Sequence, residues 1–389
     1  MKFSELIFKM NSQNNMLKSK GIQIVKGKII VTVDKRNLDN ETICEICSKA
    51  NYINEKYKMM FIPIVFYMPK ITLVDKLSYV LLESITYTLM QKFGRIVEFR
   101  FNVATNIITE GFKYSPLWNI TNGSMNYKKK KEEFLSKFSF NIYKYHYRRL
   151  LKYEECNGND KLSKVYDELV YFQKHCEINS DVREEIAEVS IELIGNAIEH
   201  SNSDCLIDFD IANHYKNLQG ESVNSLNLAI VNYSENLLAD KLAKAIKTYN
   251  PSTDLNNRYK KVLEAYNNHS KFFNEQYGEE DFFNISTFQN RISSRQNNPM
   301  TGGTGLTKLL KSVEDKSENH ACYVLTGNKI IILDRDYLEY EGDWIGFNKE
   351  HDYFNTLPNL DLIQRSKFFM PGTAYNLNFI MKVGDENEK

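Results

Sequence analysis

Long apolar runs and a secretory leader are both missing from this sequence. Its longest apolar stretches fall short of the roughly 20 residues that a membrane-spanning helix needs. Its first residues do not show the layout of a signal peptide. Its six cysteines are too few and too scattered for a disulfide scaffold in a chain of 389 residues. These features predict a cytoplasmic protein with no membrane partner.

An excess of charge of either sign is also missing. Lys and Arg total 50, and Asp and Glu also total 50, so no overall charge draws the chain to nucleic acid or acidic lipid. The length is sufficient for two hydrophobic cores. Segments with strand-like and helix-like patterns alternate along the chain, and we therefore predict an α/β (α+β) protein of two domains.

The most informative segment is 191–200, which carries a carboxylate and a carboxamide four residues apart. On a helix, Glu192 and Asn196 lie on one face and one turn apart. A carboxylate in such a position can act as a general base, and an amide oxygen can ligate a hard cation such as Mg²⁺. We therefore predict that Glu192 is catalytic and that Asn196 is a metal ligand.

A glycine-rich motif follows much later in the chain. Its residues Thr301-Gly302-Gly303-Thr304-Gly305-Leu306 open a second helical pattern. Backbone N–H groups of glycines at a helix N-terminus form a binding site for phosphate. A Mg²⁺ ligand combined with a phosphate site indicates a nucleoside triphosphate, so the expected ligands are ATP and Mg²⁺.

These motifs resemble those of the GHKL ATPases, the superfamily of gyrase, heat-shock-type chaperones, mismatch-repair ATPases, histidine kinases and anti-sigma serine kinases. The segment 192–200 matches the E-x-x-x-N-A N-box, Gly303-Thr304-Gly305 matches the glycine motif, and 371–379 resembles the closing strand. The histidine that ends this N-box makes it most similar to anti-sigma kinases and histidine-kinase-like ATPase domains. The resemblance extends over roughly residues 150 to 383.

The resemblance implies a Bergerat fold, a two-layer α/β sandwich, for residues 181–389. Within it the family places an ATP lid, here at about 237–300. This lid sequence is long and polar, and we expect few buried contacts to hold it without ligand. Residues 1–120 predict a small mixed α/β domain for regulation or partner binding, and 121–180 predict a helical connector.

The base-binding motif departs from the family pattern. Asn232 stands where the family has an aspartate that accepts from the adenine amino group, and Ser234 and Asn236 replace glycines. An asparagine can present either an acceptor or a donor, so guanine is not excluded, although ATP remains the expected nucleotide. The nucleotide contacts implied by the resemblance are Asn196, His200, Asn232, Thr301, Gly302, Gly303, Thr304, Gly305, Leu306 and Thr373.

The function implied is slow ATP hydrolysis, with closure of the lid acting as a switch that a protein partner reads. Two alternatives stay open: a serine/threonine protein kinase of the anti-sigma type, and a nucleotide sensor that does not hydrolyse. We expect no downstream transducer domain and no phospho-acceptor helix of a histidine kinase. Such a stand-alone ATPase fits a bacterial stress or anti-phage system, and it is compatible with a homodimer.

Local patterns predict several further elements. Residues 22–25 and 28–33 predict a hairpin at Lys26-Gly27, and 96–101 predict a strand parallel to the strand at 61–67 after a helix over 74–93. A second hairpin is predicted at Gly327-Asn328.

Three smaller motifs leave alternatives open. The pair Cys44 and Cys47 lacks a second pair to complete a zinc site. Arg291 or Arg295 is a candidate contact for the γ-phosphate. The basic, tyrosine-rich stretch 127–153 is either a solvated face that couples the domains or a contact to nucleic acid.

Overall fold

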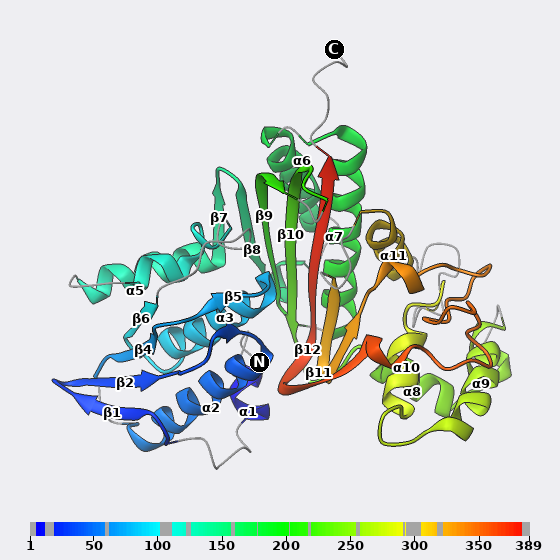
Figure 1. Cartoon of the computed structure of the whole chain (residues 1–389), viewed down its shortest axis with the longest axis horizontal. Coiled ribbons are helices and arrows are strands. Elements are labelled where there is room, and N and C mark those ends of the chain that lie inside the picture. The colour runs from blue at the N-terminus through cyan, green and yellow to red at the C-terminus, as the bar shows by residue number, and fades with distance from the viewer. Residues whose placement is uncertain are drawn as a thin grey trace.

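A computed structural model of the chain is a mixed α/β structure with several sheets (Figure 1). It describes residues 5–11, 19–58, 62–101, 111–121, 126–156, 160–176, 178–201, 203–216, 219–253, 257–290, 292, 305–316 and 322–382. Within these ranges, every helix is too short or too polar to cross a membrane.

The N-terminal unit is built on a four-stranded sheet in the order β1-β2-β4-β6. The strands are β1 (Ile22–Val25), β2 (Lys28–Thr32), β4 (Ile64–Met68) and β6 (Val97–Phe101). β1 and β2 form the predicted antiparallel hairpin, which is thereby confirmed. β4 and β6 run parallel, as predicted for a strand–helix–strand crossover.

The helices of this unit are α1 (Glu5–Met10), α2 (Asn40–Lys56) and α3 (Lys76–Gln91). Asp39 caps α2 by accepting from the N–H of Thr42 at 2.9 Å, and Asp75 caps α3 by accepting from the N–H of Ser78 at 2.6 Å. The short strands β3 (Asn37–Leu38) and β5 (Thr72–Leu73) pair in parallel just before these helices.

The segment predicted as a helical connector is only partly helical. It contains η2 (Pro116–Ile120), α5 (Tyr127–Ser139), η3 (Tyr153–Cys156) and α6 (Asp160–His175). Between α5 and η3, however, β7 (Phe140–Tyr143) and β8 (His146–Leu151) form a hairpin that extends the C-terminal sheet. All six residues of β8 are buried or half-buried because the strand lies inside the sheet, between β7 and β9, and the basic composition of the stretch gave no sign of this burial.

The C-terminal sheet has the order β11-β12-β10-β9-β8-β7, and all of its pairs are antiparallel. Its other strands are β9 (Cys205–Lys216), β10 (Ser222–Tyr233), β11 (Tyr323–Ile332) and β12 (Ile363–Lys382). The N–H of Leu333 donates to the carbonyl of Cys322 at 2.9 Å, so the two ends of β11 meet. This contact agrees with the predicted hairpin at Gly327, whose φ is +54°.

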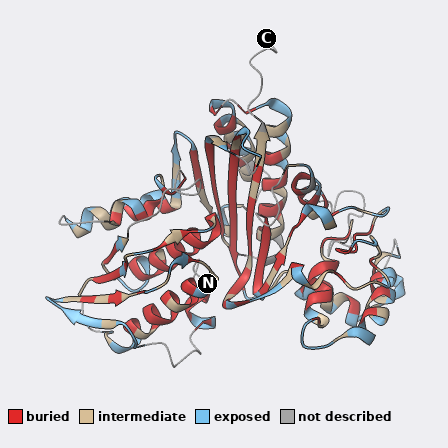
Figure 2. Cartoon of the chain, viewed as in Figure 1, coloured by how far each residue is buried: buried red, intermediate tan, exposed pale blue. Residues whose placement is uncertain are grey.

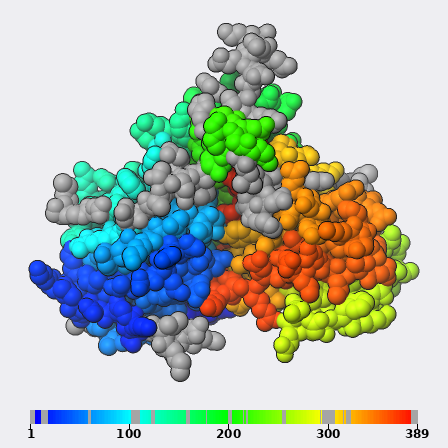
Figure 3. Space-filling view, viewed as in Figure 1, coloured from blue at the N-terminus to red at the C-terminus, as the bar shows by residue number. Residues whose placement is uncertain are grey.

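The remaining helices cover or flank this sheet. α7 (Ser180–Ser201) and α11 (Gly305–Lys316) lie along it, and α8 (Asp240–Lys247), α9 (Arg258–His269) and α10 (Glu279–Ser286) form a group on the side away from the N-terminal unit (Figure 1). Short 3-10 turns are η4 (Pro251–Thr253), η5 (Ser270–Phe272), η6 (Arg335–Tyr337) and η7 (Leu360–Leu362). In Figure 3 the blue N-terminal unit and the orange and yellow segments lie at opposite sides of the molecule.

The C-terminal sheet is covered on both faces, which explains why its strands are buried along most of their length (Figure 2). Along β10, Leu226, Leu228 and Ile230 pack in a core shared with α6, α7 and α11. The alternate residues Ala229 and Val231 pack in a second core shared with α2 and α3. α3 therefore lies between the two sheets, and this position explains why it is buried on nearly all sides.

A fully buried group of charged side chains joins α3 to the C-terminal sheet. Lys76 of α3 forms ion pairs with Asp208 and Asp210 of β9. Arg148 of β8 pairs with Asp208 and with Glu83 of α3. All five side chains are at most 2% exposed, so each charge depends on its partners because water cannot solvate it.

Polar neighbours complete this buried network. His146 Nε2 donates to Asp208 Oδ2 at 2.9 Å while its Nδ1 accepts from Asn141 at 3.0 Å, an arrangement that fits a neutral imidazole. Asn227 donates to Asp210 at 2.9 Å. Burial lowers the pKa of His146, in agreement with the neutral form. Burial also raises the pKa of Glu83 to about 7, against the opposing effect of Arg148.

Removing the ammonium group of this network should destabilise the fold strongly. We expect Lys76→Met to lower the free energy of unfolding by about 3–5 kcal/mol, because Asp208 and Asp210 lose their shared cation while they remain buried. Urea unfolding of the purified protein measures this loss. The control is Lys70→Met, which alters an exposed lysine in a turn and should change stability little. Adding Asp208→Asn and Asp210→Asn to Lys76→Met should restore part of the loss, and a further loss instead would contradict the electrostatic explanation.

Glu83 should make stability fall as pH rises between about 4.5 and 7. Its folded pKa is raised from 4.5 to about 7, so in this window the folded state binds a proton that the unfolded state has released. Wild type should therefore lose up to about 1.4 kcal/mol per pH unit relative to Glu83→Gln. Unfolding curves of both proteins at several pH values measure the difference. The other groups of the network, His146 included, are the same in both proteins, so the comparison isolates Glu83, and parallel pH profiles would show that Glu83 does not titrate there.

Candidate functional site

The predicted base and metal ligand lie one turn apart on α7. Both Glu192 and Asn196 are half-buried, and Leu193 and Ile194 between them are buried in the core beneath the helix. The apolar residues therefore fix the rotation of α7 against the sheet. This rotation leaves Glu192 and Asn196 on a side of the helix where they keep partial access to solvent.

Ion pairs place the start of α11 beside these two residues. Glu185 of α7 accepts from Lys316 at 2.8 Å and from Ser312 at 2.5 Å, and Glu188 accepts from Lys308 at 2.8 Å. Later residues of α7 pair with earlier residues of α11, so the two helices run antiparallel. The next turn of α7, which carries Glu192, therefore lies beside the first residues of α11.

This arrangement brings the predicted base and metal ligand toward the end of the glycine motif. Gly305 is the first residue of α11, and Leu306 is half-buried against the core of the sheet. Thr301, Gly302, Gly303 and Thr304 lie outside the described residues, as do Arg291 and Arg295. His200 belongs to the last turn of α7, but its side chain is also outside the described part.

The two predicted base contacts are direct neighbours in the sheet. Asn232 of β10 pairs with Thr373 of β12, and each lies next to a row of residues that face α7 on its own strand. Along β10 those residues are Leu228 and Ile230, and along β12 they are Tyr375 and Leu377. Because side chains alternate between the two faces of a strand, Asn232 and Thr373 both point toward the α7 layer.

The amide of Asn232 has a fixed orientation. Its Nδ2 donates to the carbonyl oxygen of Asp204 at 3.2 Å and to Ser203 Oγ at 2.5 Å. The carbonyl of Asp204 can only accept, so the NH₂ group must face it. A contact from Asn232 to a ligand would therefore use the acceptor Oδ1. The sequence had left donor and acceptor open, and the structure favours the acceptor.

Ser203 and Asp204 belong to this site, although sequence reasoning missed them. They follow the last turn of α7 directly and precede β9. Their contact with Asn232 places the C-terminal end of α7 against the end of β10. The sequence does show a short polar link between the helix and the next strand, which brings the ends of these two elements together. Only the pairing of β9 with β10 shows that this link lies beside Asn232.

The expectation of a weakly packed lid is wrong for residues 237–290. Most described residues of this segment are helical, and its aromatic side chains Tyr259, Tyr277, Phe282, Phe283 and Phe288 are buried in the core that also includes the α7 face of the sheet. Further rings come from a segment distant in sequence: Trp344 stacks on Tyr353 with centroids 5.2 Å apart. The average polarity of the segment gave no sign of this packing, because partners such as Trp344 and Tyr353 lie far away in the sequence.

An ion pair also ties this helical group to the sheet. Lys329 Nζ lies 2.5 Å from Asp281 Oδ1, and the two side chains are 9% and 2% exposed. The N–H of Leu238 donates to Thr326 Oγ1 at 3.1 Å. These contacts hold the helical group against the sheet.

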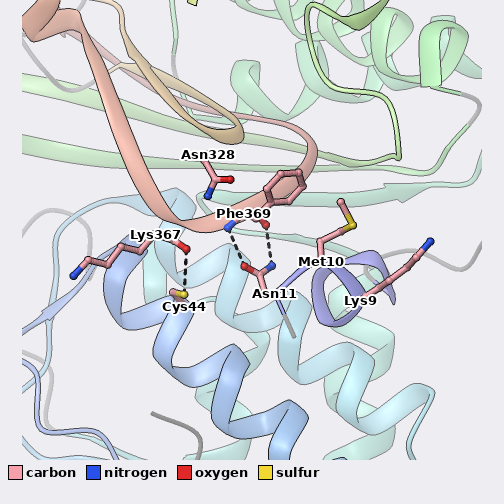
Figure 4. Close-up of a pocket in the computed structure, with 7 residues that line it drawn as sticks. All are labelled: Lys9, Met10, Asn11, Cys44, Asn328, Lys367 and Phe369. Carbon is pink, nitrogen blue, oxygen red and sulfur yellow. Dashed lines mark hydrogen bonds between the residues drawn. The ribbon is translucent and has the colours of Figure 1, made fainter. Parts of the chain in front are cut away.

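A cavity lies on the other face of the sheet. It has a volume of about 560 Å³ and is bounded by α1, α2 and the bent ends of β11 and β12 (Figure 4). Asn11 holds the backbone of Phe369 there by two hydrogen bonds of 2.9 Å. Its two lysines pair with carboxylates, Lys9 with Glu235 and Lys367 with Glu41. This cavity is separate from the residues predicted to bind nucleotide.

The CxxC pair is part of the N-terminal core. Cys44 Sγ donates to the carbonyl of Lys367 at 3.3 Å, and Cys47 Sγ to that of Ile7 at 3.8 Å. Burial raises the pKa of both thiols, which disfavours the thiolate that a metal would need. In the ranges that the structure describes, no three His, Cys, Asp or Glu side chains come together as a metal site.

Comparisons with protein-family models, with curated proteins and with solved structures gave no match. The functional argument therefore rests on the motifs and on the positions of their residues.

Proposed function

We propose that this chain is a Mg²⁺-dependent ATP-binding protein with a Bergerat-type C-terminal domain that hydrolyses ATP slowly. One observation supports this most: four predicted residues from three separate elements share the α7 layer of the sheet. These are Glu192 and Asn196 on α7, Asn232 on β10 and Thr373 on β12. The antiparallel contact of α7 with α11 adds the end of the glycine motif to the same layer.

Each residue has a role that its chemistry suits. Thr373 and the Oδ1 of Asn232 would contact the base, and the start of α11 would face the phosphates. Glu192 would take the proton of the attacking water. The amide oxygen of Asn196 is a hard ligand of the type Mg²⁺ prefers, and Mg²⁺ commonly takes few protein ligands because water and substrate phosphates supply the rest.

Protein kinase activity and nucleotide sensing use the same site, so the product distinguishes them. Free phosphate indicates an ATPase, a labelled protein indicates a kinase, and tight binding without either product indicates a sensor. The departure of the base-binding motif from the family pattern, with Ser234 and Asn236 in place of glycines, favours the sensor as the second candidate. The turn after β10 is held by Ser234, whose N–H donates to the carbonyl of Pro371 at 3.2 Å and whose Oγ accepts from Asn236 at 3.0 Å.

Substitutions on α7 should separate binding from turnover. Asn196→Ala should weaken Mg²⁺-ATP binding in calorimetry, since it removes the amide ligand. Glu192→Ala should keep binding and lose about 10²–10⁴-fold in phosphate release, since it removes only the base. Glu184→Ala, on an exposed side of the same helix, serves as the matched control. If wild type fails to bind ATP or GTP with Mg²⁺, the proposal is refuted. If Glu192→Ala hydrolyses ATP as fast as wild type, Glu192 is not the general base.

The orientation of Asn232 should give a preference for ATP over GTP. Its Oδ1 can accept from the amino group of adenine, whereas guanine presents a carbonyl oxygen at that position. Loss of one neutral hydrogen bond costs about 0.5–1.5 kcal/mol, so Asn232→Leu should weaken ATP binding up to about tenfold and change GTP binding little. Competition calorimetry with both nucleotides measures this. Wild type that binds GTP as tightly as ATP would show that Asn232 does not face the base.

A further inference from the structure

Exposed aromatic side chains gather in one part of the chain, between η2 and the turn of the β7–β8 hairpin. Large apolar side chains seldom remain in water without a reason when several lie together. Those of this part are Trp118 (50% exposed), Phe140 (51%), Ile142 (43%), Tyr143 (54%) and Tyr145 (39%). Part of the basic stretch therefore carries rings that the fold does not bury.

Contacts link the segment that contains η2 to the hairpin and to α5. The ring of Tyr114 meets that of Tyr143 edge-on with centroids 5.9 Å apart. The ammonium of Lys144 lies 5.5 Å from the centroid of the Tyr143 ring. Lys137 of α5 donates to Asn119 at 3.2 Å, beside Trp118. We call this set the hairpin surface: Trp118, Lys137, Tyr143, Lys144 and Tyr145.

The charge around the hairpin surface is strongly positive. The helix α5, which leads into β7, has the sequence YKKKKEEFLSKFS, with five lysines against two glutamates. Its pair Lys129–Glu133 is long, at 4.0 Å, and exposed on both sides, so it offsets little of the charge. Since the whole chain has 50 residues of each charge, this concentration is local, and α5 extends outward from the body of the molecule (Figure 1).

We propose that the hairpin surface and α5 bind single-stranded nucleic acid. Exposed rings stack on bases, and lysines beside them attract the phosphate backbone, the combination that single-strand binding sites use. Stacking needs unpaired bases, so duplexes should bind less well. This proposal is independent of the nucleotide site, because the hairpin lies at the far edge of the sheet from β11 and β12.

A competing occupant is a second copy of the chain. β7 is the outermost strand of the sheet, and an edge strand with exposed apolar side chains can pair with another edge. Charge argues against this occupant, since two copies would bring their basic α5 helices toward each other. Nucleic acid is favoured because it neutralises these lysines while it covers the rings.

The first experiment measures binding of the full chain to a fluorescein-labelled single-stranded oligonucleotide of about 20 nucleotides, longer than the usual site. Fluorescence anisotropy should show binding at about 50 mM salt that weakens steeply toward about 200 mM, because each phosphate contact releases counterions. A duplex of the same length should bind more weakly. Absence of any anisotropy change at low salt with protein at about 100 µM would overturn the proposal.

The second experiment tests the rings and the charges separately. Tyr143→Ala and Tyr145→Ala should each weaken binding roughly tenfold, and Tyr143→Leu should do the same while it keeps the apolar bulk of the side chain. Lys137→Glu with Lys144→Glu should weaken binding and also reduce its salt dependence. The matched control is Lys271→Glu with Phe272→Ala, another exposed lysine and aromatic pair on the distant helical group, and it should bind as wild type does.

Three further outcomes would overturn the proposal. If Tyr143→Leu and Tyr145→Ala bind as tightly as wild type, the rings do not stack on bases and the binding is only a nonspecific attraction between charges. Equal loss in the Lys271/Phe272 control would mean that the contacts lie elsewhere. The third outcome is a dimer that forms with rising concentration in sedimentation, that Ile142→Lys dissociates, and that binds no oligonucleotide. This result would show that β7 pairs with a second copy of the chain. Circular dichroism of each variant confirms that the loss is not one of folding.

Discussion

The buried charges between α3 and β9 are the interaction on which the rest of this structure depends. Asp208 and Asp210 point to the same face of β9, where the N-terminal unit covers them and both side chains are fully buried. Without Lys76 and Arg148 these carboxylates would be buried and unpaired, at a cost that no nearby apolar contact could offset. The N-terminal unit is therefore required by the C-terminal sheet as its second cover, and α3 is held in one position by the geometry of the ion pairs.

This arrangement gives the two faces of the sheet different tasks. The α7 face carries the candidate nucleotide residues, and the opposite face carries the charge network and the N-terminal core. β9 belongs to both: it begins directly after Ser203 and Asp204, which hold Asn232, and it carries Asp208 and Asp210 further along. A displacement at the end of α7 would thus reach α3 through a single strand. This is a physical route by which the N-terminal unit can respond to an occupied site.

The sequence predicted much of this fold because its signals were local. The hairpin at Lys26-Gly27, the crossover around α3 and the helix that carries Glu192 all follow from turn residues, caps and periodicity within one segment. What it missed depends on distant partners. The aromatic core of 237–290 is completed by Trp344 and Tyr353, and the charge network joins residues from 76 to 210. Asn232 was recognised by its place in a motif, but its orientation is set by Ser203 and Asp204, which no motif contains.

The β7–β8 hairpin has a consequence for how the chain can be divided. The family resemblance implied a domain that begins at residue 181, yet β8 pairs with β9 along six residues from His146 to Leu151. A protein cut at residue 180 would lose Arg148 from the network and would present β9, buried on both faces, as an open edge. Such a fragment would be prone to pair with other strands and aggregate. The C-terminal sheet therefore needs residues on both sides of the boundary at residue 180.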